Sequence, residues 1–184
     1  MQNPEVSEKN VQWFDSMVHG MLKAAHAYLP KRLAKWVAMY YSDAEIRKLY
    51  AAYIGVEMGE GTYANLGMKV VPNDNRLCVH LGNRVSVAPN VVFVCNSAAN
   101  NGIEINEIDY VKNVLTNSGD IHVADEVWIG ANVTILPNVT IGRCSVIGAG
   151  SVVTSDVEEY SIYAGTPARK IRDLRTGKRA DGKQ

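Results

Sequence analysis

The sequence predicts a mainly β fold built around a parallel β-helix, with a helical segment in front of it. Large aliphatic residues recur at every sixth position, and these are Val123, Ile129, Ile135, Ile141, Ile147 and Val153. A second set follows four positions after each of them: Val127, Val133, Val139, Ser145, Ser151 and Val157. A period of six is neither the roughly 3.6 of an α-helix nor the alternation of a two-sided sheet. It is typical of short repeats that form a shared core by stacking.

Each six-residue unit is expected to supply one short strand and one corner, so that three units complete a triangular coil. Residues that tolerate positive φ recur at fixed places in the units: Asn90, Asn132, Asn138, Gly130, Gly142 and Gly148. Tight corners require such residues. An ordinary β-sandwich is the alternative, but its turn signals recur at roughly 8–12 residues.

An earlier block keeps the same register. Leu81, Val87 and Phe93 are spaced by six, and the 30 residues from Phe93 to Val123 equal five further units. We therefore expect one coil over 81–98, an insertion over about 99–122, and the next coil from Val123. A loop of this length inside a compact repeat is more often functional than accidental.

The two ends of the chain read differently from the repeats. We expect an N-terminal helical segment over 1–60, the β-helix over 61–168 and a basic C-terminal tail over 169–184. Ser42 and Glu45 have the spacing of a capping box before a helix. The segment 21–41 mixes apolar and basic residues, which fits a helix that packs on the core or on another subunit better than a membrane-surface helix.

Composition limits the class of protein. The chain has 184 residues, with 19 basic and 19 acidic side chains, so strong nonspecific nucleic-acid binding is not expected. Its three cysteines form no CxxC pair, which suits a reducing compartment. No apolar run long enough for a membrane span and no signal-peptide pattern is present, so we expect a cytoplasmic protein.

The repeats resemble those of the left-handed β-helix acyltransferases, particularly the maltose, galactoside and nodulation-factor O-acetyltransferases. The resemblance covers residues 45–174 and is carried by Val127-Trp-Ile-Gly-Ala-Asn132, Val146-Ile-Gly-Ala-Gly-Ser-Val-Val-Thr154, Ala164-Gly-Thr-Pro-Ala-Arg169 and Tyr63-Ala-Asn65. It implies a homotrimer that uses acetyl-CoA as co-substrate. It also implies the left hand of the coil, since parallel crossovers are otherwise overwhelmingly right-handed.

The resemblance implies a site for the co-substrate along the coils. Its candidate residues are Trp128, Ala131, Ala149, Thr154, Arg169, Lys170 and Arg172. The three basic residues suit the phosphates of CoA, and the small residues would let the pantetheine arm approach the backbone. A solvated basic tail and packing of Trp128 at a subunit interface are the alternatives.

Acetyl transfer to a hydroxyl needs a base, and His is suited to that role near neutral pH. The sugar acetyltransferases carry this His in the loop after the first coil, where the present chain has Val94-Cys-Asn-Ser-Ala-Ala-Asn-Asn101 and no His. His122 is the first candidate to replace it and His80 the second. Both precede the first aliphatic residue of a coil, so they are expected to stack, with Thr140 and Glu158 next in the column.

Further candidates concern the acceptor. By similarity to the sugar enzymes, Tyr63 and Asn65 would hold the acceptor, and Asn65 could donate to the oxyanion. Asn96, Asn100 and Asn101 are candidate sugar contacts in the loop.

The sequence thus predicts an acetyl-CoA-dependent O-acetyltransferase acting on a sugar or polysaccharide precursor, with a His general base and no metal. The missing loop His leaves a second reading open, a catalytically inactive trimer that binds CoA or serves as a scaffold in polysaccharide biosynthesis. A β-helix carbonic anhydrase is a third reading. It would need three His around zinc, and the chain has four His in all, without the short-spaced pair of that family.

Overall fold

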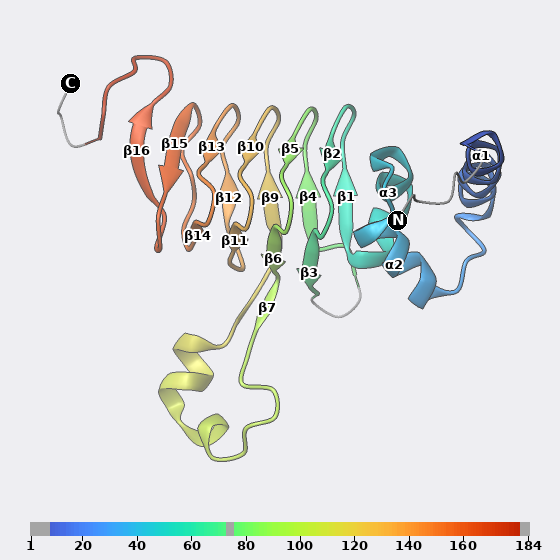
Figure 1. The fold of residues 1–184 in the computed structure, drawn as a ribbon. Coiled ribbons are helices and arrows are strands. Elements are labelled where there is room, and N and C mark those ends of the chain that lie inside the picture. The colour runs from blue at the N-terminus through green and yellow to red at the C-terminus, as the bar shows by residue number, and fades with distance from the viewer. Residues whose placement is uncertain (1–7, 73–75, 181–184) are drawn as a thin grey trace, which may run out of the picture.

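The computed structural model describes residues 8–72 and 76–180, and its centre is a three-sided prism of stacked coils (Figure 1). The first face holds β1 (Val56–Met58), β4 (Val79–Leu81), β9 (Ile121–Val123) and β12 (Thr140–Ile141). The second face holds β2 (Tyr63–Ala64), β5 (Ser86–Val87), β10 (Trp128–Ile129), β13 (Val146–Ile147), β15 (Ser161–Ala164) and β16 (Arg169–Asp173). The third face holds β3 (Lys69–Val71), β6 (Val92–Val94), β11 (Thr134–Ile135) and β14 (Val152–Val153).

The six-residue register of the sequence is the register of the prism. Strands one coil apart pair in parallel, as in Trp128 with Val146 and Thr134 with Val152. Every predicted inward aliphatic residue from Val123 to Val153 is at most 3% exposed. The second predicted set, from Val127 to Val157, is at most 4% exposed. The predicted core is therefore confirmed, and each strand contributes one or two side chains to it.

The corners confirm part of the prediction and correct another part. Asn90, Asn132 and Asn138 adopt φ of 59°, 57° and 65°, as expected. Gly130, Gly142 and Gly148 do not adopt positive φ, so their expected role was wrong. They are required for space instead, because a Cβ on Gly130 would lie 2.6 Å from the backbone N of Ala149 in the next coil.

Helices close the N-terminal end of the prism (Figure 1). They are α1 (Glu8–Ala25), α2 (Lys31–Tyr40), α3 (Ala44–Tyr50) and the short 3-10 helix η1 (Ala51–Ile54). The predicted helix start near Ser42 is shifted by one residue, since the Asp43 side chain accepts the bond from the Ile46 N–H at 2.9 Å. The hydroxyl of the fully buried Tyr50 donates to the Leu22 carbonyl at 2.8 Å and so ties α3 to α1.

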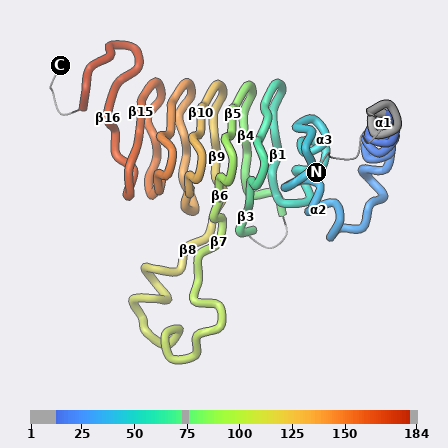
Figure 2. The backbone as a smooth tube through the Cα atoms, viewed as in Figure 1, coloured from blue at the N-terminus to red at the C-terminus, as the bar shows by residue number. Residues whose placement is uncertain are grey.

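The insertion is an arm that projects from the prism where the third face meets the first (Figure 2). It leaves through β7 (Asn96–Ser97) and returns through the antiparallel β8 (Asn117–Ser118). Between them lie the 3-10 helix η2 (Ile105–Glu107) and the π-helix η3 (Val111–Leu115). Ile121 and His122 already belong to β9, within the stack.

At the far end of the prism, β16 turns back antiparallel to β15 and ends the stack. The predicted tail over 169–184 thus begins with a strand, and the helices at the other end give way to β1 at Val56. The division of the chain at residues 60 and 168 stays a prediction. Within the described residues, no helix is both long and apolar enough to cross a lipid bilayer.

Candidate functional site

The two candidate histidines stack on the first face of the prism. His80 in β4 and His122 in β9 are paired residues of neighbouring parallel strands. Their ring centroids lie 4.8 Å apart and their planes differ by 11°. The stacking expected from the six-residue period is therefore confirmed. It follows from the spacing of neighbouring strands, which is close to the same distance.

Carboxylates hold one of these rings. His80 Nδ1 lies 3.1 Å from Glu57 Oε2, and its Nε2 lies 3.6 Å from Asp120 Oδ2. Asp120 also forms an ion pair with Arg76, with 2.7 Å between Arg76 Nη2 and Asp120 Oδ1. The hydrogen bond from Arg76 is the main reason why the pKa of Asp120 lies below its ordinary value. The result is a chain of charged contacts from Arg76 through Asp120 to His80.

The ring of His122 is left open. Its side chain is exposed, and no hydrogen bond to the ring is found in the parts of the chain that the structure describes. A groove of about 350 Å³ follows the column and is lined by Glu57, His80, His122 and Thr140 together with neighbouring backbone. A ring nitrogen of His122 can therefore accept a proton from a molecule in this groove.

The next residue in the column differs from the prediction. Ile141 pairs with Val157, which is 16 residues later instead of 18, so Asp156 and not Glu158 lies beside Thr140. The backbone N–H of Thr140 donates to Asp156 Oδ1 at 2.7 Å. The last coil is shorter because it ends the stack, and a strict period cannot show this.

His80, Asp120 and His122 also offer one ligand atom each, all within 4.8 Å of one another. These three groups could hold a metal ion, although the ion pair with Arg76 competes for the carboxylate. The three-histidine set of the carbonic anhydrase reading is not assembled here, since this cluster contains two histidines.

The predicted acceptor residues lie around a corner from the histidines, on the second face. Tyr63, Asn65 and Trp128 line a hollow of about 300 Å³ together with Arg47. Asn65 Oδ1 accepts a bond from the Leu66 N–H at 2.8 Å, which leaves the amide N–H groups as donors. One chain therefore does not bring Asn65 and His122 onto the same face.

Arg47 forms the floor between this hollow and the helices. It is 5% exposed, and its guanidinium donates to the carbonyls of Ala64 at 2.8 Å, Ser42 at 2.7 Å and Tyr41. Burial lowers the pKa of Arg47 below its ordinary value. The side chain thus joins the helical cap to β2 beside the predicted acceptor residues.

The three asparagines of the arm are not gathered into one cluster. Asn96 lies in β7 and pairs with Ser118 at the root of the arm, whereas Asn100 and Asn101 are exposed farther out. At the root, Asn138 Nδ2 donates to Asn117 Oδ1 at 2.8 Å and ties the arm to the next coil.

The predicted co-substrate residues follow the second face toward the end of the prism. Trp128 is 61% exposed on β10, as its register predicted. Ala131 and Ala149 occupy the corner after β10 and β13, where the Gly150 N–H donates to the Ala131 carbonyl at 2.8 Å. Thr154 is exposed directly after β14.

The three predicted phosphate ligands lie on β16, and each has a contact within the chain. Lys170 Nζ is 2.6 Å from Glu158 Oε2, and this hydrogen bond is the main cause of the raised pKa of Lys170. Arg172 donates to the Gly177 carbonyl at 2.8 Å and Arg169 to the Ala168 carbonyl at 2.9 Å. Their role as phosphate ligands stays a prediction.

Sequence reasoning did not single out Glu57, Arg76 and Asp120. Asp120 lies two residues before His122, which was a usable signal, but the insertion hid its place in the register. Glu57 lies 23 residues before His80, a separation that is not a multiple of six. The register at β1 becomes visible only in the folded chain.

Comparison with known proteins identifies the repeats. Residues 120–155 match the family described as bacterial transferase hexapeptide, six repeats. Galactoside O-acetyltransferase of Escherichia coli is 37% identical over 119 residues, which cover 65% of this chain and 54% of that protein. An acetyltransferase-type protein of Schizosaccharomyces pombe is 31% identical over 181 residues, which cover 91% of this chain and 80% of that protein. The chain belongs to the hexapeptide-repeat acyltransferase family.

A solved member of the hexapeptide-repeat acetyltransferases agrees with this assignment. The acetyltransferase of Vibrio cholerae complexed with acetyl coenzyme A is 33% identical, with a TM-score of 0.54, and the match covers 65% of this chain and 61% of that one. The predicted fold class, a mainly β left-handed parallel β-helix with N-terminal helices, is confirmed. The chain spans little more than half the length of the galactoside O-acetyltransferases of Escherichia coli and Lactococcus lactis.

Proposed function

We propose that this chain is an acetyl-CoA-dependent O-acetyltransferase that acts on a hydroxyl group of a sugar or polysaccharide precursor. The observation that carries the proposal is the stacked pair of His80 and His122 along an open groove, in a chain of this family. A hydroxyl that attacks a thioester must lose its proton, and imidazole is suited to take it near neutral pH.

His122 is the general base in this proposal, because its ring is exposed and free of hydrogen bonds within the described residues. The hydroxyl oxygen bonds to the thioester carbonyl carbon, and the carbon–sulfur bond breaks. The proton that His122 takes then passes to the departing thiolate. His80 is a positioning residue, since Glu57 and Asp120 hold its ring and the stack in turn holds His122.

The second face supplies the remaining groups. The amide N–H groups of Asn65 are placed as donors for the acceptor or for the oxyanion, beside Tyr63. Trp128, Ala131, Ala149 and Thr154 would line the path of acetyl-CoA. The small residues fit this role because no long side chain blocks the corner backbone, and the basic residues of β16 would bind phosphate.

A homotrimer would complete the site. His122 and Asn65 lie on different faces of one prism, so a threefold arrangement can bring the first face of one copy to the second face of its neighbour. A cytoplasmic protein fits the three free cysteines, of which Cys78 and Cys95 are buried.

The test is a free-thiol assay of acetyl-CoA turnover over a panel of mono- and oligosaccharides. We expect acceptor-dependent release of CoA that falls about 10²- to 10⁴-fold in His122→Ala, the usual contribution of a general base. His26→Ala is the matched control, since His26 lies beyond the C-terminal end of α1, away from the groove. Full turnover in both His122→Ala and His80→Ala would refute the mechanism. CoA binding without turnover on any acceptor would favour the inactive scaffold.

A further inference from the structure

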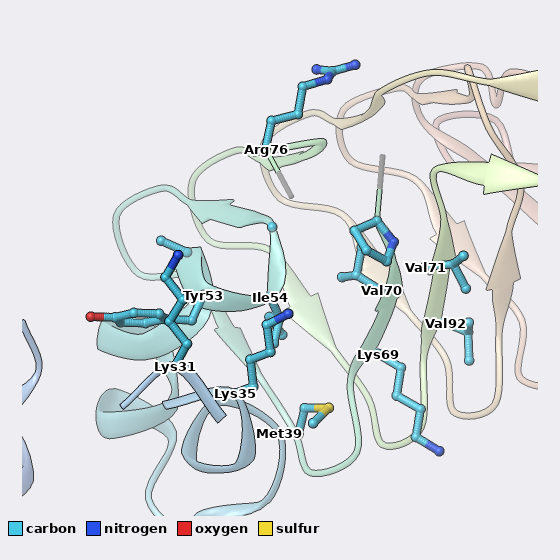
Figure 3. A pocket seen from close by; sticks show the side chains of 13 residues that line it. Lys31, Lys35, Met39, Tyr53, Ile54, Lys69, Val70, Val71, Arg76 and Val92 are labelled. Atoms are coloured by element: carbon cyan, nitrogen blue, oxygen red, sulfur yellow. The ribbon is translucent and has the colours of Figure 1, made fainter. Parts of the chain in front are cut away.

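A second, larger cavity lies between α2 and the third face of the prism. It has a volume of about 740 Å³, within the range of small-molecule sites. Figure 3 shows Lys31 and Lys35 reaching from α2 toward Tyr53 and Ile54, with Met39 and Val70 between them and Lys69. None of the candidate site residues predicted from the sequence lines this cavity.

The charges around the cavity are all positive. Lys31, Lys35, Lys69 and Arg76 line it, and no acidic side chain does. No ion pair of the three lysines is found among residues 8–72 and 76–180. Lys31 and Lys35 are four residues apart on one helix, an arrangement that is mildly unfavourable for like charges. An anion bound between them would remove this repulsion.

The other walls of the cavity are apolar. Met39, Ile54, Val70 and Val92 contribute aliphatic and thioether side chains, and Tyr53 contributes an aromatic ring. A small inorganic anion would satisfy the lysines and leave these walls in contact with water. The lining therefore suits an anion that carries an apolar or aromatic body.

The cavity is connected to the histidine pair by one residue. Arg76 lines the cavity and forms the ion pair with Asp120, whose other oxygen lies 3.6 Å from His80 Nε2. A ligand in the cavity thus lies beside the chain of contacts that ends at the stacked rings.

We propose that this cavity binds the diphosphate part of an activated acceptor, so that the sugar presented to His122 is carried on a diphosphate. This inference rests on the proposed function, because it names the class of its acceptor. The lysines bind the diphosphate oxygens, and the apolar walls contact either the base of a nucleotide or the first units of a lipid chain.

Binding is measured first, by calorimetry without acetyl-CoA, with three probes: inorganic pyrophosphate, uridine diphosphate and geranyl diphosphate. We expect one of the two organic diphosphates to bind more tightly than pyrophosphate, and the tighter one identifies a nucleotide or a lipid carrier. The double variant Lys31→Gln/Lys35→Gln should weaken that binding at least about tenfold, since it removes two charge-assisted contacts. Arg32→Gln is the matched control, because it removes the same charge from the same helix outside the cavity. It should change the affinity less than about twofold.

Two results would overturn the inference. One is the failure of both organic diphosphates to bind at about 1 mM, a concentration that detects weak binding. The other is equal weakening by the double variant and by Arg32→Gln. The proposed function is tested separately, by turnover. Diphosphate binding without acetylation of any acceptor would support the cavity and contradict the function. Acetylation of a neutral sugar with an unchanged KM in the double variant would do the reverse.

Discussion

His80 and His122 stack with their ring centroids 4.8 Å apart, yet only His80 is held by carboxylates. Both rings come from the same register position of neighbouring parallel strands. The difference arises because Glu57 precedes His80 in the column and Asp120 lies where the arm returns to the prism. The pair is therefore asymmetric, with one fixed ring and one ring open to the groove.

Asp120→Asn should lower stability at neutral pH by about 0.5–1 kcal/mol, the range of partly exposed ion pairs. The pKa of Asp120 is lowered in the folded state, chiefly by Arg76, from an ordinary value of 3.8. Its contribution is therefore fully present above that value and is lost as the pH falls through the lower folded-state pKa. Urea denaturation at pH 7 and near pH 3 should show a difference from wild type that shrinks in acid. Asp109→Asn, in the exposed arm, is the control, and an equal difference at both pH values would contradict the prediction.

Ile135→Ala should destabilise the protein by about 2–5 kcal/mol, because Ile135 is 0% exposed inside the stack and its loss leaves a cavity. Ile103→Ala makes the same chemical change in the arm, where the side chain is 87% exposed, and should have an effect within about 0.5 kcal/mol. Denaturant unfolding of both variants checks the contrast. Similar losses of stability would mean that the arm is packed in solution.

Two glycines should respond to alanine in opposite directions. A Cβ on Gly130 would lie 2.6 Å from the Ala149 N, so Gly130→Ala forces neighbouring coils apart and should cost about 1–3 kcal/mol. Gly20 lies within α1 with nothing within 4 Å of its Cβ position. Gly20→Ala should therefore stabilise by about 0.5–1 kcal/mol through helix propensity. Thermal unfolding should move the two midpoints apart, and a shared direction would argue against this account of the corners.

Tyr50→Phe should lower the free energy of unfolding by about 1–3 kcal/mol. The change leaves the Leu22 carbonyl without the bond that it accepts from a fully buried hydroxyl. Tyr28→Phe removes a hydroxyl from a side chain that is 87% exposed and serves as the control. Urea titration followed by circular dichroism measures both, and an unchanged midpoint for Tyr50→Phe would show that the bond does not stabilise the helical cap.

Much of the candidate site follows from the repeat, and part of it does not. The spacing from His80 to His122 is seven units of six, so their common column and their stacking could be predicted. Glu158 was placed in that column by the same rule, and the rule failed because the final coil is shorter. Partners such as Glu57 and Arg76 precede the regular repeats, where no period reports the register.

By itself the sequence determined the stacked prism, its inward side chains, its asparagine corners and the place of the arm. A strict period does this because each unit repeats the same local burial pattern, which only stacking can satisfy. Only the tertiary structure decided that the corner glycines are needed for space, that Asn65 and His122 lie on different faces, and that four cations surround one apolar cavity. These features depend on contacts between residues far apart in the chain, and their geometry exists only after the coils and the helices have packed together.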